Sequence, residues 1–156
     1  MSVANLVLAL EANLQAEIGA KNAQIALLEG QEQAIAARDV DALTRASTEL
    51  QVHAHREIDR ATKRTVTLTE LARALELPAS ARVGDVATAL GPRGRTLAAR
   101  RTELRVRCAA SLKKSRHVAA LVRGHASLVE EALGRYLAPD PSGAPLGRGS
   151  LVDAEA

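Results

Sequence analysis

The sequence predicts an all-α protein: an antiparallel hairpin of two long helices, a third long helix and a flexible C-terminal tail. Among the 156 residues there is no Trp, no Phe and one Tyr, whereas strands of sandwiches and barrels depend on aromatic and β-branched residues. Most of the apolar content is Ala, Leu and Val, and the first two are the strongest helix formers. Apolar residues also recur every three or four positions over long stretches, as in an elongated coiled-coil-like bundle.

The first helix is expected over residues 3–37. At 1.5 Å per residue it is ~50 Å long, so it must lie along other helices rather than inside a compact globule. Its seam contains one four-residue stutter and two polar positions. The seam residues are Val7, Leu10, Leu14, Ile18, Lys21, Ile25, Leu28, Glu32 and Ile35.

The second helix is expected over residues 40–76. Asp39 is a natural N-cap, because its carboxylate can accept from free backbone N–H groups of the first turn. The very short break before it makes the two helices antiparallel neighbours. We expect a stuttered seam of Val40, Leu43, Ser47, Leu50, Ala54, Ile58, Ala61, Thr65, Leu68, Ala72 and Leu75.

The third long helix is expected over residues 95–137, after a short helix at about 85–90 and a Gly-Pro-Arg-Gly breaker. The helices form one domain, residues 1–138, and the Pro- and Gly-rich residues 139–156 form the tail. The expected seam of the third helix is Leu97, Arg101, Leu104, Cys108, Leu112, Ser115, Ala119, Val122, Ala126, Val129, Leu133 and Tyr136.

Charge is distributed unevenly along the chain. Residues 1–50 carry three bases and seven acids, whereas residues 91–125 carry ten bases and one acid. Within this basic stripe, residues 93–123, four bases recur every seven positions: Arg93, Arg100, Arg107 and Lys114. Two interpretations stay open: the stripe pairs with the acidic first helix, or it binds an acidic partner. Nucleic acid is not expected as that partner, because no DNA-binding motif and no aromatic platform is present.

The cysteine and histidine residues are poorly placed to form a catalytic or metal-binding site. Cys108 is the only cysteine, lies on the apolar seam and is expected to be a buried, inert thiol. His53 and His55 point about 200° apart on a helix, and His117 and His125 are about 12 Å apart. There is no glycine-rich phosphate loop. We therefore expect no catalytic residue, no metal site, no cofactor and no enzymatic activity.

The last helix carries apolar residues that are not required to bury the apolar seams of the hairpin. Two long helices can bury each other's seams, so the third either completes a three-helix bundle or leaves apolar surface free for a partner. The candidate partner-binding residues are Leu112, Val118, Leu121, Val122, Leu128, Val129 and Leu133.

In outline the chain resembles the FlgN-type flagellar export chaperones. The family's N-terminal half has a Leu-Leu-Glu, an apolar pair, an Asp-x-x-x-Leu turn and a charged helix, and its tail has a Tyr, a Gly spacer and an apolar-acidic end. The family's Asn-x-x-Asn-Gly-x-Leu stretch is represented here only by Leu121. The matching residues are Leu27–Glu29, Ala34-Ile35, Asp39–Leu43, Glu49–Ile58, Tyr136, Gly143 and Leu151–Ala154.

The resemblance implies a cytoplasmic, non-enzymatic chaperone. Such proteins bind the C-terminal helical segments of the hook–filament junction proteins, prevent premature assembly and deliver these clients to the type III export apparatus. The resemblance also implies that Tyr136 contacts the cytosolic domain of the export gate. No signal peptide and no membrane insertion are expected. The chaperone itself is expected to be a monomer or a weak homodimer. The alternative is a structural coiled-coil protein that self-associates through the same seams, and a basic helical nucleic-acid binder ranks third.

Overall fold

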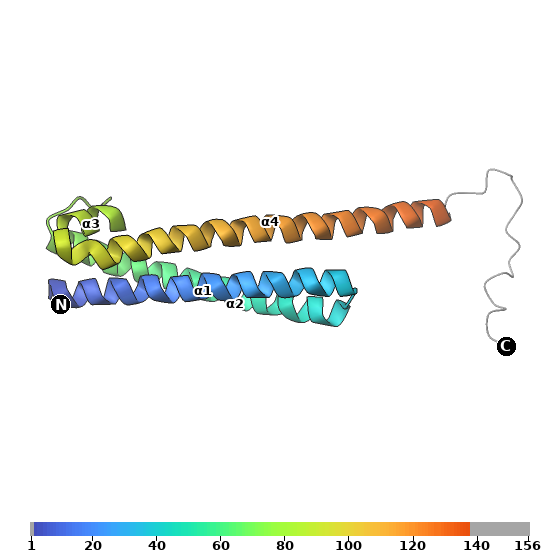
Figure 1. Ribbon diagram of the computed structural model, residues 1–156, viewed down its shortest axis with the longest axis horizontal. Helices are drawn as coiled ribbons and strands as arrows, with labels where there is room; N and C mark the ends of the chain where they lie inside the picture. The colour runs from blue at the N-terminus through green and yellow to red at the C-terminus, as the bar shows by residue number, and fades with distance from the viewer. Residues whose placement is uncertain (1, 138–156) are drawn as a thin grey trace, which may run out of the picture. The chain divides into compact units, whose positions relative to one another are not determined.

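A computed structural model describes residues 2–137 of the chain, and these residues are helical and contain no strand (Figure 1). The all-α prediction is confirmed. The chain divides into two units, residues 1–121 and residues 122–156, which we describe separately. None of the helices in the described part is both long and apolar enough to span a bilayer. The elements are α1 (Val3–Ala37), α2 (Val40–Ala74), α3 (Val83–Ala89), the 3-10 helix η1 (Gly91–Gly94) and α4 (Arg95–Leu137).

The helices begin and end where local chemistry dictates. Ser2 Oγ accepts from the Asn5 N–H at the start of α1. Arg38 closes that helix in the left-handed conformation, with φ of 56°. Asp39 Oδ1 then accepts from the Ala42 N–H at 2.8 Å, which confirms the predicted N-cap of α2.

Three helix boundaries differ slightly from the prediction. The second helix ends at Ala74 rather than residue 76, and the short helix spans Val83–Ala89 rather than 85–90. The expected tail, residues 139–156, lies outside the described residues, so the division at residue 138 stays a prediction.

Side-chain hydrogen bonds fix the register of the hairpin. In successive bonds the residue number on α1 increases while the residue number of its partner on α2 decreases, as it must in an antiparallel pair of helices. The bonds join Asn13 to Thr67, Lys21 to Glu57 and Gln31 to Ser47.

The apolar core of the first unit brings together the start of α1, the end of α2, α3 and the start of α4. Burying large aliphatic side chains stabilises this region by roughly 1.5–3 kcal/mol for each. In α2 only Leu71 and Ala72 are buried, and both are near its C-terminal end. The core residues are Leu6, Leu10, Leu14, Ile18, Leu71, Val86, Ala87, Leu97 and Leu104.

Gly94 allows η1 to approach α3 closely. A Cβ added at this position would lie 2.1 Å from the carbonyl oxygen of Ala87, which is far inside van der Waals contact. Because the neighbouring atom belongs to the backbone, no side-chain rotation can relieve the clash. Glycine is therefore required here, at the base of α4.

The stutter predicted for the second seam is wrong. Ile58, which that seam includes, is 66% exposed. Its place is taken by part-buried polar residues that keep a regular spacing of three and four residues after Leu50. They are His53, Glu57, Arg60 and Arg64. Between Leu50 and the apolar core, part-buried polar side chains therefore occupy the regular heptad positions of α2.

Candidate protein-binding face

In the first unit, α4 buries one residue in every seven. The buried residues are Leu97, Leu104, Ser111 and Val118. Leu97 and Leu104 of the predicted seam are thereby confirmed, but its step to Leu112 after Cys108 is wrong. Leu112 is 53% exposed, because the regular repeat places its neighbour Ser111 inward instead.

The structure also places Cys108 and two of the expected site residues, Val118 and Leu121, differently from the prediction. Cys108 is exposed, so the expectation of a buried thiol is wrong. Val118 is only 5% exposed and belongs to the packed side of α4, so it is not available to a partner. Leu121 is half-buried.

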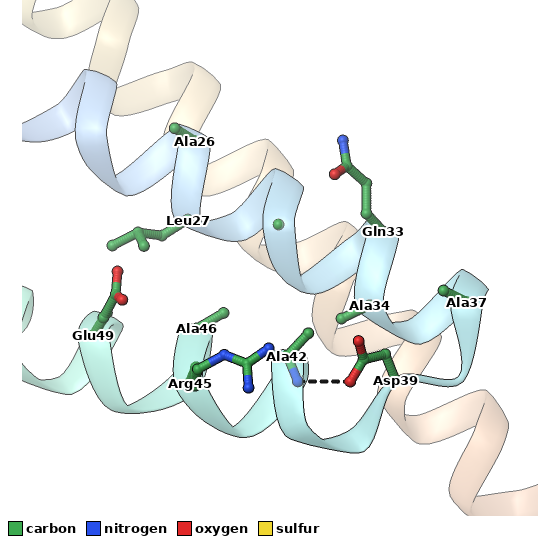
Figure 2. Close-up of a pocket in the computed structure, with 11 residues that line it drawn as sticks. Ala26, Leu27, Gln33, Ala34, Ala37, Asp39, Ala42, Arg45, Ala46 and Glu49 are labelled. Carbon is green, nitrogen blue, oxygen red and sulfur yellow. Dashed lines mark hydrogen bonds between the residues drawn. The ribbon is translucent and has the colours of Figure 1, made fainter.

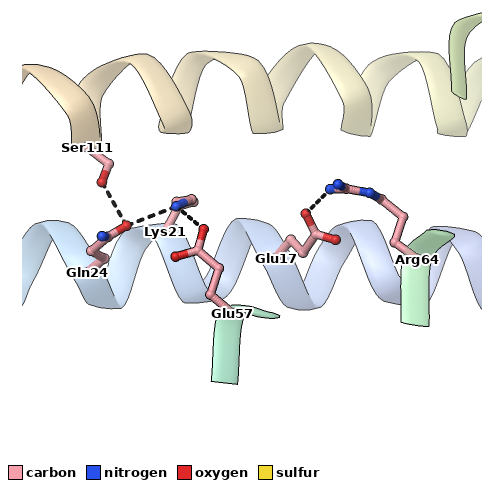
Figure 3. Close-up of polar contacts among 6 residues, drawn as sticks. All are labelled: Glu17, Lys21, Gln24, Glu57, Arg64 and Ser111. Atoms are coloured by element: carbon pink, nitrogen blue, oxygen red, sulfur yellow. Dashed lines mark hydrogen bonds and ion pairs between the residues drawn. The ribbon is translucent and has the colours of Figure 1, made fainter. Parts of the chain in front are cut away.

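A chain of polar contacts connects the three long helices of the first unit (Figure 3). Ser111 Oγ of α4 donates to Gln24 Oε1 of α1 at 2.8 Å. Lys21 Nζ donates to the same oxygen at 3.0 Å and also forms an ion pair with Glu57 of α2. Each of these buried or half-buried polar groups thereby has a partner, which offsets the cost of removing it from water.

A second ion pair, between Glu17 of α1 and Arg64 of α2, lies one turn nearer the apolar core (Figure 3). Burial raises the pKa of the Glu17 carboxyl above its usual value, and the charge of Arg64 opposes that rise. The nearby Glu57 raises this pKa further, whereas Arg60 and Lys21 lower it.

Some residues of the basic stripe contact α1 and so help to hold α4 in place. Lys114 forms an ion pair with Glu32 of α1, and His117 Nε2 lies 3.0 Å from the other oxygen of the same carboxylate. The hydrogen bond from Lys114 is the main reason why the pKa of Glu32 is lowered. Arg100 donates to Gln15 of α1. Arg107, also in the stripe, is exposed.

The end of the hairpin carries an open depression of about 440 Å³ (Figure 2). Small side chains of both helices line it, among them Ala34 of α1 and Ala42 and Ala46 of α2. Two charged side chains of α2, Arg45 and Glu49, also line it. The sequence reasoning did not find this feature, although the recurrence of alanine on both helices was a visible signal.

In the second unit, described from Val122 to Leu137, every residue is exposed. This includes an apolar row with successive steps of four, three, four and three residues, which places its members on one side of the helix. We call this row the apolar face of α4. It consists of Val122 (46% exposed), Ala126, Val129 (57%), Leu133 (55%) and Tyr136 (90%).

The structure thus brings three of the predicted site residues together on one face: Val122, Val129 and Leu133. Tyr136, expected to contact an export gate, ends the same row. Leu128 is 64% exposed, but a single residue step turns it about 100° away from Val129. Leu112 belongs to the first unit.

The arrangement is suited to packing against another helix. Within residues 2–137 no three His, Cys, Asp or Glu side chains are grouped as metal ligands. An aliphatic row at heptad spacing is the pattern that an amphipathic partner helix recognises. Comparisons of the chain with family models, with curated proteins and with solved structures found no match.

Proposed function

We propose that this protein is a cytoplasmic, non-enzymatic type III export chaperone of the flagellum. In this proposal it binds the C-terminal helical segments of hook–filament junction proteins, prevents their premature assembly and delivers them to the export apparatus. The observation that carries the proposal is the exposed apolar face of α4, and the sequence resemblance described above supplies the identity of the clients.

Burial of the apolar face against a client helix supplies favourable free energy for binding. Each Å² of apolar surface removed from water contributes about 25 cal/mol, so covering several aliphatic side chains supplies several kcal/mol before ordering costs are subtracted. The face has no large aromatic anchor besides Tyr136, and its remaining members are aliphatic. A shallow surface of this kind accepts helices with differing side chains, as two different clients require.

Tyr136 is available for a second contact. Its side chain is 90% exposed, and it ends the apolar face rather than lying at its centre. An exposed aromatic ring with a polar hydroxyl is a frequent anchor in protein interfaces. We assign it to the cytosolic domain of the export gate, the contact that the resemblance implies for this tyrosine.

The proposal is tested by titrating labelled C-terminal segments of the junction proteins and measuring fluorescence anisotropy. The variant Val122→Asp/Val129→Asp places two charges on the apolar face. The control, Ser127→Asp/Gly134→Asp, adds the same charge at the same seven-residue spacing on another side of the helix. We expect at least tenfold weaker binding for the first variant and nearly unchanged binding for the control.

The self-association alternative predicts a different result with the same proteins. If the apolar face joins two copies, light scattering of the unmodified protein gives twice the monomer mass, and Val122→Asp/Val129→Asp converts it to a monomer. A monomer that forms a 1:1 complex with a client segment supports the chaperone. A stable dimer that does not bind either segment contradicts it.

A further inference from the structure

The basic side chains of α4 in the first unit fall into two groups. Arg100 and Lys114 are half-buried and contact α1 through Gln15 and Glu32. Others are exposed and form no ion pair with any residue in the described part of the chain; they include Arg101, Arg105 and Arg116. The first group connects α4 to α1, whereas the second leaves its charge unpaired within the described residues.

Arg101, Arg105 and Arg116 share one side of α4 with Leu112. The steps between the four residues are four, seven and four, which keeps them within about 60° around the helix over a length of ~22 Å. Leu112 is 53% exposed and lies between Arg105 and Arg116 along the helix. We call these four residues the arginine–leucine side of α4.

One of these arginines is positioned by the fold. The guanidinium of Arg101 lies over Gly84 of α3, so close that a Cβ at that position would be 3.3 Å from its central carbon. A guanidinium held against a neighbouring helix loses less side-chain entropy when it binds a carboxylate. The only acidic residue between positions 91 and 125 is Glu103, so the local field is strongly positive.

We propose that the arginine–leucine side of α4 binds an acidic amphipathic helix of another protein. Guanidinium groups form paired, charge-assisted hydrogen bonds with carboxylates. The partner therefore carries Glu or Asp at the corresponding four- and seven-residue intervals and an apolar residue over Leu112. This interaction is separate from client capture and uses none of the residues of the apolar face.

A protein helix fits this side better than a nucleic acid does. Leu112 contributes apolar area that a phosphate backbone cannot cover. The chain has no Trp, no Phe and one Tyr, which is outside this side of the helix, so unpaired bases have no ring to stack on.

The test uses a designed 18-residue helical peptide with Glu at positions 3, 7 and 18 and Leu at position 14, labelled with a fluorophore. The same peptide with Gln in place of Glu is the probe control. Binding to the full chain is measured by anisotropy at low and at physiological salt. We expect the Glu peptide to bind, its affinity to fall as salt rises, and the Gln peptide to bind at least tenfold more weakly.

The variant Arg101→Glu/Arg105→Glu/Arg116→Glu is expected to weaken binding of the Glu peptide at least tenfold. The control Arg45→Glu/Arg56→Glu/Lys63→Glu reverses three exposed bases of α2, so the change of net charge is identical and binding should persist. Circular dichroism verifies that both variants keep the helicity of the unmodified protein. Val122→Asp/Val129→Asp should bind the peptide normally, which separates this proposal from client capture.

Three results would overturn the proposal. The first is that the unmodified protein does not bind the Glu peptide at low salt. The second is that both triple variants lose binding equally, since that assigns the effect to net charge alone. The third is that a 20-base-pair duplex DNA, or vesicles containing phosphatidylserine, bind more tightly than the peptide and compete with it.

Discussion

Ser111 of α4 donates a hydrogen bond to the side-chain oxygen of Gln24 of α1 at 2.8 Å. Ser111 is 4% exposed and occupies the heptad position between Leu104 and Val118, where an aliphatic residue would normally lie. This polar pair therefore occupies one position of a buried row on α4 whose other members, Leu97, Leu104 and Val118, are aliphatic.

The bond between Ser111 and Gln24 contributes to stability. We predict that Ser111→Ala lowers the free energy of unfolding by about 1 kcal/mol, the usual worth of a neutral hydrogen bond. Gln24 keeps its bond from Lys21, so its oxygen is not left without a partner. Chemical denaturation of Ser111→Ala, Gln24→Ala and the double variant measures the coupling. Fully additive effects would show that the two residues do not interact.

Glycine at position 94 is predicted to be essential for the junction of η1 with α3. Gly94→Ala should destabilise the protein by about 3 kcal/mol, because the added Cβ meets the carbonyl oxygen of Ala87. Gly19→Ala is the control, since nothing lies within 4 Å of its added Cβ and alanine favours a helix interior. Thermal unfolding should show a lower midpoint for the first and an equal or higher one for the second. Equal midpoints for Gly94→Ala and the unmodified protein would refute the contact.

The basic stripe should divide into residues that stabilise the fold and residues that do not. Lys114→Glu places a second carboxylate beside Glu32, so we predict a lower melting temperature, with a larger effect at low salt than at high salt. Arg107→Glu should leave the melting temperature nearly unchanged, because Arg107 is exposed. Melting curves at two salt concentrations measure both effects. A larger loss for Arg107→Glu than for Lys114→Glu would reverse this assignment.

The pair of Glu32 with Lys114 also predicts a dependence of stability on pH. The folded protein lowers the pKa of Glu32, chiefly through the Lys114 hydrogen bond, so the ionised carboxylate favours the folded state. This stabilisation is fully present above the ordinary value of 4.5 and is lost as the pH falls through the lower, folded-state value. The melting temperature of the unmodified protein should therefore exceed that of Glu32→Gln at neutral pH. The difference should shrink below pH 4.5, and replacing Lys114 by Gln should reduce it to the smaller part that His117 contributes.

Helix positions could be predicted from the sequence because they depend on local signals. Asp39 caps α2, and the Gly-Pro-Arg-Gly breaker precedes α4. Each acts through backbone groups within a few residues of itself, so no tertiary information is needed. These signals gave both ends of α1 and α4, and they placed the ends of the other helices within two residues.

The packed sides of α2 and α4 could not be predicted equally well. A search for apolar periodicity places Ile58 and Leu112 on the packed side of their helices. It places polar residues such as Glu57 and Ser111 on the side that faces solvent. The structure keeps the regular heptad instead and provides partners for the polar side chains on α1. Because such pairs join residues more than 30 positions apart, nothing in one helix alone indicates that its polar residues are buried.

The most direct test of the proposed chaperone function is the affinity of the full chain for the C-terminal segment of a hook–filament junction protein. We predict a 1:1 complex for the unmodified protein and for Ser127→Asp/Gly134→Asp. For Val122→Asp/Val129→Asp we predict at least tenfold weaker binding, about 1.4 kcal/mol, with helicity by circular dichroism retained. Undiminished binding by this helical variant, or no binding of either junction segment by the unmodified protein, would contradict the proposed function.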